Sequence, residues 1–558
     1  MKRLRKISAV LMCAWAFPAA ALAQQTSPPP PPAPLPTVTP SGNPSEPPGA
    51  SPLPSPPPSL SPLVATPASI ATNVGLQQNI SIAGATGPVT ATFDNKVASV
   101  SITGTTITLG PLRNGTATLH VVDSSNNASV EVPVRIAPNA GTIAPQVFLK
   151  VTGANPDPAF IAAQAALALT RATSVQPRAV LQLSPIAPPA APLPVGSQTI
   201  INVPVTIAGG AQYLDVSGTT QIAVSNVAAA PFAPSLLFYS DDPERILGDG
   251  VLWRGTVTGA APVRLYDYHE NGTRPRHLLV ALTTPSTATS SVQVVERFAG
   301  PNPDVMTVGH AVTRDFLINK TRNQGVVFDI AGNAPLFMHD VSMNQLDGVA
   351  SAIDVNVLAG GPVTVTVLAV SAGVNPATLL DSAPLPGDGR NRHGVFALGN
   401  YGTKSLAYAA GAQDVTIDIG DREPTLQAVP PQSTGKDFGD YGVLFNLTFA
   451  LTNPTALSQT VYLYEAPRGG PARANYLIDA DPAPVELGCA TSARAATDAP
   501  HRYQIRSFVL APGASETHTV LTMTDGGSNL PITVGMTTTP PAAAVPPISA
   551  PDGCFPKP

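Results

Sequence analysis

The sequence predicts an all-β fold, built from several antiparallel β-sandwich units with one short connecting helix and disordered proline-rich segments. Hydrophobic residues make up 43% of the 558 residues, enough to bury a core, which excludes a chain that is disordered throughout. Proline accounts for 64 residues, too many for a mostly helical protein and without the period of collagen. Short β-branched runs, separated by Gly, Asn and Asp, recur along most of the chain and indicate strands.

The first 23 residues have the pattern of a signal peptide. Four basic side chains within positions 2–6 precede an apolar stretch over 7–20, which is short for a membrane span. Ala21-Leu22-Ala23 fits a small-x-small cleavage site, so we expect cleavage near Ala23-Gln24 and a secreted or periplasmic protein. Cys13 follows no small residue, which argues against a lipoprotein. The alternative is an uncleaved N-terminal anchor.

The charge of the chain excludes a further class of function. Without residues 1–23 it carries 26 basic and 35 acidic side chains, a net charge of −9. It has no basic tract with which to neutralise phosphates, so we expect no nucleic-acid partner. No later apolar run reaches the roughly 18 to 20 residues of a membrane-spanning helix, so we expect no transmembrane segment after cleavage.

Residues 24–68 are predicted to be a proline-rich disordered spacer. They contain 18 prolines in 45 positions and one charged side chain, Glu46, and such a segment cannot bury enough apolar surface to fold. As polyproline II at about 3.1 Å per residue it would reach on the order of 140 Å, long enough to hold a domain away from an attachment point. The alternative is an inert tail.

Residues 69–137 are predicted to form a β-sandwich. Alternating runs such as 79–82, 88–93 and 128–136 are separated by turn residues, among them Asn114-Gly115. The runs 100–109 and 115–123 resemble bacterial immunoglobulin-like domains. The resemblance implies a spacer or adhesive module on a secreted protein, without catalytic residues.

Residues 138–196 are predicted to be a connector. Asp157 and Pro158 fit the N-cap and first position of a helix over about 157–171, which is rich in alanine. Six prolines then fall within residues 177–194, and such a proline-rich linker is typical of a domain boundary.

Two further β-units are predicted, a β-rich domain over 197–410 and a sandwich-like domain over 411–540, followed by a proline-rich tail over 541–558. Alternating runs such as 362–370 and 443–451 favour antiparallel sheets. The segments 237–252, 263–273, 440–455 and 460–470 resemble a family of secreted bacterial β-rich domains of unknown function, over about 197–540. That family supplies no catalytic residues.

Two cysteines remain after signal cleavage, Cys489 and Cys554. In an oxidising compartment such a pair predicts one disulfide, which would tie the proline-rich tail to the last β-unit. The alternative is two separate thiols. A metal site is not expected, because the two cysteines lie far apart and neither has a histidine beside it.

The densest polar cluster of the sequence lies between positions 240 and 277. Strand alternation would place Asp267 and His269 on one face of a strand, where a carboxylate and an imidazole could act as a base or bind a cation. A hairpin at Asn271-Gly272 could bring His277 beside them. The favoured alternative is a polar strand face with a charged hairpin tip. The candidate residues are Asp241, Asp242, Glu244, Asp267, His269 and His277.

Two weaker candidates follow. The segment 387–393 partly resembles a calcium loop, but two arginines occupy the intervening positions and no closing Glu follows, so a plain turn is favoured. Carboxylates at 418–440 could in principle cleave a glycoside, although no spacing selects one pair. Tyr266 and Tyr268 would point away from Asp267, into a platform or, as we favour, a core.

The sequence contains no Gly-x-Ser-x-Gly, no His-Glu-x-x-His and no phosphate-binding loop. We therefore expect an exported envelope or extracellular protein that binds or scaffolds, without catalysis and without a cofactor. Its expected partner is a cell-envelope polysaccharide or another surface protein. The alternatives are a secreted polysaccharide hydrolase that uses carboxylates near 241–270, and a purely structural surface component.

Overall fold

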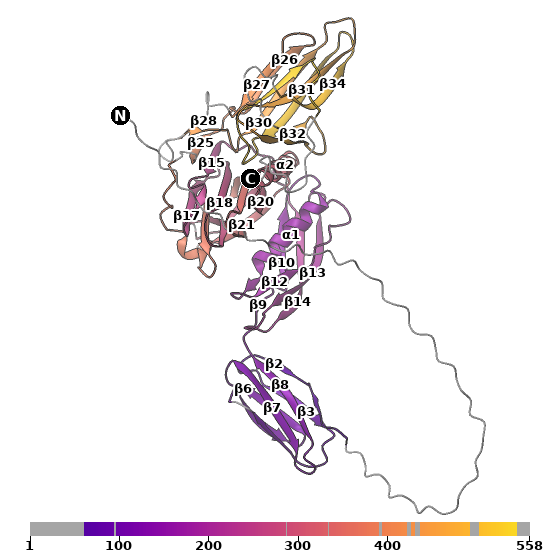
Figure 1. The fold of residues 1–558 in the computed structure, drawn as a ribbon, viewed down its shortest axis with the longest axis vertical. Helices are drawn as coiled ribbons and strands as arrows, with labels where there is room; N and C mark the ends of the chain where they lie inside the picture. The colour runs from indigo at the N-terminus through magenta and orange to yellow at the C-terminus, as the bar shows by residue number, and fades with distance from the viewer. Residues whose placement is uncertain are drawn as a thin grey trace, which may run out of the picture. The chain divides into compact units, whose positions relative to one another are not determined.

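The computed structural model describes residues 61–93, 96–285, 287–332, 334–389, 393–420, 426–429, 436–490 and 501–543. The predicted signal peptide and nearly all of the predicted spacer and tail lie outside these residues. Strands dominate the described chain, which also contains two α-helices, so the predicted all-β class with sandwich-like sheets is confirmed (Figure 1).

Residues 62–137 form a sandwich of two four-stranded sheets, with strand orders β1-β3-β6-β5 and β2-β8-β7-β4. Alternate residues of β7 point into the core, where Leu119 and Val121 meet Ile80, Ile107 and Leu109 of the facing sheet. The strands are β1 (Val64–Thr66), β2 (Ile70–Thr72), β3 (Gln78–Ala83), β4 (Val89–Phe93), β5 (Ala98–Thr103), β6 (Thr106–Pro111), β7 (Gly115–Asp123) and β8 (Ser129–Ile136).

The middle of the chain forms one large sheet of eleven strands. Its order is β12-β13-β14-β10-β21-β20-β23-β18-β15-β25, and β16 pairs with β18. The strands are β10 (Gln146–Val151), β12 (Val180–Leu183), β13 (Gln198–Ala208), β14 (Val216–Asn226), β15 (Leu236–Ser240), β16 (Arg245–Ile246), β18 (Val263–Asn271), β20 (Ser290–Asn302), β21 (Val326–Ile330), β23 (Gly348–Ala359) and β25 (Gly394–Ala397).

This sheet crosses the domain boundary that the prolines of 177–194 predict. β12 lies inside that segment and pairs antiparallel with β13, while β10 runs parallel to β14 and antiparallel to β21. The predicted connector therefore contributes two strands to the same sheet as the residues after 197. The prolines that follow β12 leave its short alternating run, 180–183, free to pair, because they lie outside the strand.

A four-stranded sheet of order β17-β24-β19-β22 shares a hydrophobic core with the large sheet. Trp253 of β17 lies in this core, with its ring centroid 5.7 Å from that of Phe238 of β15. The strands are β17 (Gly250–Val257), β19 (Arg276–Thr283), β22 (Leu336–Met343) and β24 (Val363–Ser371), and the short elements nearby are β9 (Gly141–Thr142), β11 (Ser174–Val175) and the 3-10 helix η1 (Pro376–Leu379).

Two helices pack on the large sheet. Helix α1 (Pro158–Ala172) begins where the sequence predicts, with the Asp157 carboxylate accepting a hydrogen bond of 2.8 Å from the Ala159 amide. Helix α2 (Val305–Thr321) is not predicted from the sequence, which indicates only one helix. Asp304 caps α2, and the apolar side chains of Val312 and Phe316 pack into a core, so capping and burial stabilise a segment rich in β-branched residues.

The C-terminal strands form a second sandwich, with sheets β26-β30-β35-β32-β33 and β27-β36-β31-β34. Phe445, Phe449 and Leu463 are buried in its core, which also includes side chains of α2. The strands are β26 (Thr403–Ala409), β27 (Val415–Ile419), β30 (Leu444–Thr452), β31 (Gln459–Pro467), β32 (Ala472–Ile478), β33 (Val485–Ala490), β34 (Tyr503–Leu510), β35 (Ser515–Met523) and β36 (Ile532–Thr537), with a separate pair β28 (Leu426–Gln427) and β29 (Lys436–Asp437).

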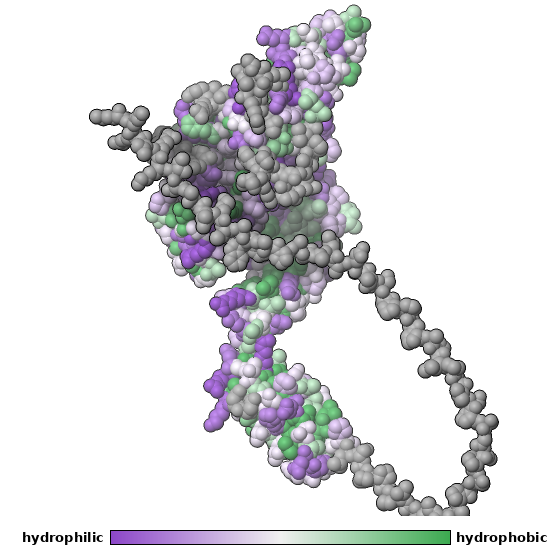
Figure 2. Space-filling view, in the orientation of Figure 1, coloured by the Kyte–Doolittle hydropathy of each residue, from purple (hydrophilic) through white to green (hydrophobic). Residues whose placement is uncertain are grey.

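The outside of the described chain mixes polar and apolar side chains. On the visible face the strongly apolar residues lie in separate patches (Figure 2), and scattered exposed apolar side chains are normal for folded proteins. Within the described residues, neither helix is long and apolar enough to cross a membrane.

Candidate binding cleft between helices α1 and α2

The predicted pair Asp267 and His269 lies on β18, and both side chains are 0% exposed. The His269 Nδ1–H donates to the Pro243 carbonyl oxygen at 3.0 Å, because a carbonyl only accepts, and the Ser240 hydroxyl lies 2.9 Å from Nε2. Burial lowers the pKa of His269 to about 4, against the hydrogen bond to Pro243, so its ring is neutral at pH 7. His269 is therefore held as a neutral core residue.

Asp267 is equally enclosed. Its Oδ1 accepts a hydrogen bond from the Ser351 hydroxyl of β23. Burial raises the pKa of Asp267 to about 6, although that hydrogen bond and the nearby His339 lower it. Strand alternation does place Asp267 and His269 on one face, but neither side chain is accessible to a substrate.

His277 does not join them. It lies on β19 of the four-stranded sheet, where its Nδ1 is 2.5 Å from Asp340 Oδ1 of β22. The sequence places His277 beyond a hairpin, but β18 and β19 enter different sheets, so the two histidines do not form one site.

Two of the three acidic residues at 241–244, Asp242 and Glu244, contact the second sequence candidate, the segment 387–393. The Asp388 amide donates to Asp242 Oδ1, and the Glu244 amide donates to Asp388 Oδ2 at 3.5 Å. Glu244, Glu270 and Asp388 line a cavity of about 740 Å³ together with Leu247 and Leu385. Strand β15 and the segment before β25 thus bring together two polar regions that are far apart in the sequence.

The remaining predictions concern residues near the end of the chain. Burial first, and then the charge of Asp440, raise the pKa of Asp437 well above its ordinary value. Asp440 accepts from the Tyr401 hydroxyl at 2.9 Å and from the Gly420 amide at 2.9 Å. Cys489 is disulfide-bonded. Its predicted partner, Cys554, lies outside the described residues, as do Arg390 and Arg392 of the calcium-like loop.

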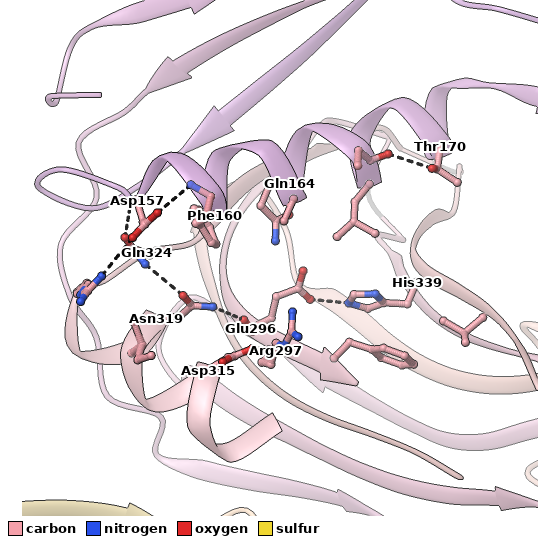
Figure 3. Close-up of a pocket in the computed structure, with 18 of the residues that line it drawn as sticks. Asp157, Phe160, Gln164, Thr170, Glu296, Arg297, Asp315, Asn319, Gln324 and His339 are labelled. Carbon is pink, nitrogen blue, oxygen red and sulfur yellow. Dashed lines mark hydrogen bonds and ion pairs between the residues drawn. The ribbon is translucent and has the colours of Figure 1, made fainter. Parts of the chain in front are cut away.

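A different place has the form of a binding site. A cleft of about 730 Å³ lies between α1 and α2, with strands β20 and β22 also contributing side chains (Figure 3). Large, mostly apolar pockets with a few convergent polar groups are where small ligands bind in proteins. None of the polar residues that line this cleft is among the site residues predicted from the sequence.

Helix α1 forms one wall of the cleft. Phe160, Ala163, Gln164 and Leu167 repeat at the spacing of one helix face, and all four line the cleft. Gln164 is only 6% exposed, and among the described residues its side-chain carbonyl oxygen has no hydrogen-bond partner. In Figure 3 the Gln164 side chain points from α1 toward Glu296. A buried amide without a partner costs free energy unless a ligand or water satisfies it.

The floor of the cleft carries a buried carboxylate–imidazole pair. Glu296 Oε2 of β20 lies 2.7 Å from His339 Nε2 of β22, and both side chains are buried. The Phe298 ring stacks on His339 with centroids 4.7 Å apart. Burial alone would raise the pKa of Glu296, but His339 and Arg171 outweigh burial and lower it below its ordinary value. Glu296 is therefore an ionised carboxylate at neutral pH.

The second wall is held by a network of polar contacts. Asp315 of α2 lies 2.9 Å from Arg297 of β20. Asn319 donates to the Glu296 carbonyl oxygen at 2.9 Å, and Gln324 donates to Asn319 at 3.2 Å. The same Gln324 accepts from the Asp157 amide at 2.7 Å, which connects the ends of α1 and α2. These contacts fix the width of the cleft.

One sequence signal points toward this cleft. Val292, Val294, Glu296 and Phe298 alternate along β20, so a carboxylate occupies an inward position of an otherwise apolar strand face. The other residues come from segments that only the fold brings together. Among the described residues, no group of three or more His, Cys, Asp or Glu side chains is arranged to hold a metal ion.

Comparison with known proteins identifies no family. No protein-family model and no curated protein matches the chain. Among solved structures, domains 5–6 of the S-layer protein SbsC show 14% identity, cover 30% of this chain and 99% of their own, and give a TM-score of 0.14. Drosophila N-cadherin EC1-4 shows 12% identity, and the match covers 30% of this chain and 50% of the cadherin chain, with a TM-score of 0.12. Bacteroides ovatus SGBP-B, in complex with a mixed-linkage heptasaccharide, shows 12% identity. The match covers 53% of this chain and 72% of SGBP-B, with a TM-score of 0.11.

These values are too low to indicate shared function or a shared overall fold. The structure itself shows only that the chain consists mainly of β-rich domains. The predicted resemblance of residues 197–540 to a family of secreted β-rich domains, and of residues 69–137 to immunoglobulin-like domains, is not matched by a family model.

Proposed function

We propose that this chain is an exported, non-enzymatic binding protein that takes a glycan of the bacterial envelope or surroundings in the cleft between α1 and α2. The observation that carries the proposal is Gln164, which lines the cleft and whose buried side-chain carbonyl oxygen has no partner among the described residues. A hydroxyl group of a ligand would supply the missing donor.

The charges of the cleft favour a neutral ligand. Its carboxylates and cations are paired with one another: Glu296 with His339, Asp315 with Arg297, and Asp157 with Arg322 at 3.7 Å. An ionic ligand would have to compete with these pairs. A polyhydroxylated ligand instead gains hydrogen bonds from charged and amide groups that are already oriented.

The apolar lining suits the less polar face of a sugar ring. Phe160 and Phe298 line the cleft from α1 and β20, and Leu167 and Val341 add aliphatic surface. Aromatic side chains with a few planar polar groups around them provide both apolar contact area and directional hydrogen bonds. This combination favours a carbohydrate over a purely apolar ligand.

The state of Glu296 argues for binding rather than hydrolysis. A glycosidase needs a carboxylic acid that is still protonated near neutral pH to donate to the leaving group. The lowered pKa of Glu296 keeps it ionised. The alternative centre near 241–270 contains Asp267, whose pKa is raised, but Asp267 and His269 are fully buried and cannot contact a polysaccharide.

Export, family and attachment belong to the same proposal. The N-terminal pattern supports cleavage between Ala23 and Gln24, after which the proline-rich residues 24–61 would separate the folded domains from the envelope. The end of the predicted spacer, residues 62–68, belongs instead to the first sandwich, which contains β1. Membership of 69–137 in the immunoglobulin-like domains, and of 197–540 in a secreted β-rich family, fits such a surface protein. N-terminal sequencing of protein recovered from cell fractions tests this part, with Gln24 expected as the first residue.

The binding part is tested by retention of the full mature chain on purified envelope polysaccharides, followed by calorimetry with oligosaccharides of the retained polymer. Gln164→Ala and Phe160→Ala are each expected to weaken binding by about tenfold, because each removes a group from the cleft wall. Gln198→Ala, on the exposed end of β13, is the matched control and should bind like the wild type. No retention on any polymer, or wild-type affinity of Gln164→Ala, would refute the proposal.

A further inference from the structure

A second, smaller cavity of about 270 Å³ lies apart from the cleft and is lined mainly by tyrosines. Tyr239 of β15 and Tyr266 and Tyr268 of β18 come from the large sheet, and Tyr441 precedes β30. The ring centroids of Tyr239, Tyr266 and Tyr441 are 5.8 to 6.4 Å apart. These three rings therefore pack against one another. Together with Tyr268 they line a space just below the size of about 300 to 1,000 Å³ that is usual for drug-sized ligands.

The charge of this tyrosine cavity is one-sided. Of the described residues that line it, Asp241 and Glu244 carry carboxylates, and none is Lys, Arg or His. The Tyr239 hydroxyl donates to Asp241 Oδ2 at 3.0 Å, which fixes that carboxylate at the wall. The negative faces of the rings and the carboxylates all favour a positive charge in the cavity that they line.

The hydroxyl group of Tyr266 is a second polar feature of the cavity. Tyr266 is 1% exposed, and among the described residues its hydroxyl has no partner. It lines the cavity beside Gly526, where a Cβ atom would stand only 2.7 Å from the hydroxyl oxygen. The turn at 526–527 therefore needs glycine to leave this space open.

The composition of the walls distinguishes between classes of cation. No group of His, Cys, Asp or Glu suited to a metal ion occurs among the described residues. Hard metal ions prefer several oxygen ligands, whereas organic ammonium ions are recognised by aromatic faces together with a carboxylate. An ammonium ion that carries N–H groups can also donate to the Tyr266 hydroxyl oxygen.

We propose that the tyrosine cavity is a binding site for a small primary alkylammonium ion, held by the faces of the tyrosines, by the Asp241 carboxylate and by the Tyr266 hydroxyl. The site shares no lining residue with the cleft between α1 and α2. It does not depend on the glycan proposal.

Calorimetry of the full mature chain with propylammonium chloride, at constant ionic strength, tests the site. Saturable binding is expected, and Asp241→Asn should weaken it by about tenfold, because the amide keeps the hydrogen bond from Tyr239 but loses the charge. Tyr266→Phe keeps the ring and removes only the unpartnered hydroxyl. This variant should bind propylammonium about threefold to tenfold more weakly than the wild type. Its affinity for tetramethylammonium, which has no N–H group, should be unchanged.

The matched control is Asp329→Asn, which removes the same charge from an exposed position on β21 outside the cavity. It should bind propylammonium like the wild type. Circular dichroism of each variant establishes that it is folded. The proposal is overturned if the wild type shows no saturable binding, if Asp241→Asn and Tyr266→Phe both bind as the wild type does, or if potassium ions compete as well as propylammonium.

Discussion

Two carboxylate–imidazole regions of the molecule differ in their surroundings. On β18, Asp267 and His269 face a packed core, where Asp267 Oδ1 accepts from Ser351 and the His269 ring bonds to Ser240 and Pro243. On β20 and β22, Glu296 and His339 bond to each other on the floor of a cleft. The comparison teaches that residue type and strand spacing identify polar groups inside a sheet, while the neighbouring helices decide whether such groups meet a ligand.

The largest expected effect comes from the β18 region. His269→Ala should lower the free energy of unfolding by about 3 kcal/mol, because it leaves a cavity in the core and removes two buried hydrogen bonds. Glycan binding by the folded fraction should not change. Denaturant titration measures the unfolding free energy, and calorimetry measures glycan binding. A loss of glycan affinity in the folded variant would contradict the claim that His269 acts only in the core.

The next effect depends on pH. The folded-state pKa of Asp267, about 6, lies above its ordinary value near 4, so the folded state binds this proton more tightly than the unfolded state does. Its ionisation therefore costs stability as the pH rises from 4 to 6. Relative to the wild type, Asp267→Asn should gain about 2 kcal/mol in unfolding free energy between pH 4 and pH 8. A difference that stays constant with pH would show that Asp267 is not buried as described.

Glu296 should show the opposite dependence. Its folded pKa is lowered, so its ionised form contributes stability above the unfolded pKa near 4, and this contribution is lost as the pH falls through the folded value. Glu296→Gln should therefore cost about 1 to 2 kcal/mol at pH 7 and progressively less at low pH. Denaturation of both variants over pH 3 to 8 checks the sign, and parallel curves for Asp267→Asn and Glu296→Gln would contradict the account.

The smallest effect is expected at His277, outside both regions. The hydrogen bond with Asp340 raises the pKa of His277, so any stabilisation is present below the unfolded pKa near 6.5 and is lost as the pH rises through the folded value. Because both side chains are partly exposed, His277→Ala should cost less than about 0.5 kcal/mol at pH 6 and nothing at pH 8. Thermal unfolding at the two pH values measures this, and a cost above 2 kcal/mol would assign His277 a role in the core.

Much of the fold follows from local patterns. The alternating run at 362–370 becomes β24, and the cap at Asp157 starts α1, because period and capping act within a few residues. Helix α2 could not be predicted from its sequence, because its Val and Thr residues favour a strand. Its stability comes from the packing of Val312 and Phe316, which only the fold shows. The eleven-stranded sheet could not be predicted either, because β10 pairs with β14 and β21, which lie far from it in the sequence.

The candidate site was less accessible to sequence reasoning. Its polar residues come from α1, β20, α2 and β22, so no spacing along the chain marks them. The inward position of Glu296 on β20 is the exception. Conversely, the density of polar residues at 241–277 identified groups that the fold divides among a core, a surface pair and two cavities.

Hydrogen–deuterium exchange of the full mature chain, with and without the polysaccharide that retains it, tests the central claim most directly. The account predicts that the ligand slows amide exchange in α1 and in β20 around residues 296–298, and that β18 around 267–269 exchanges equally slowly in both states. Protection confined to other elements, with α1 unchanged at saturating ligand, would contradict a binding site between α1 and α2.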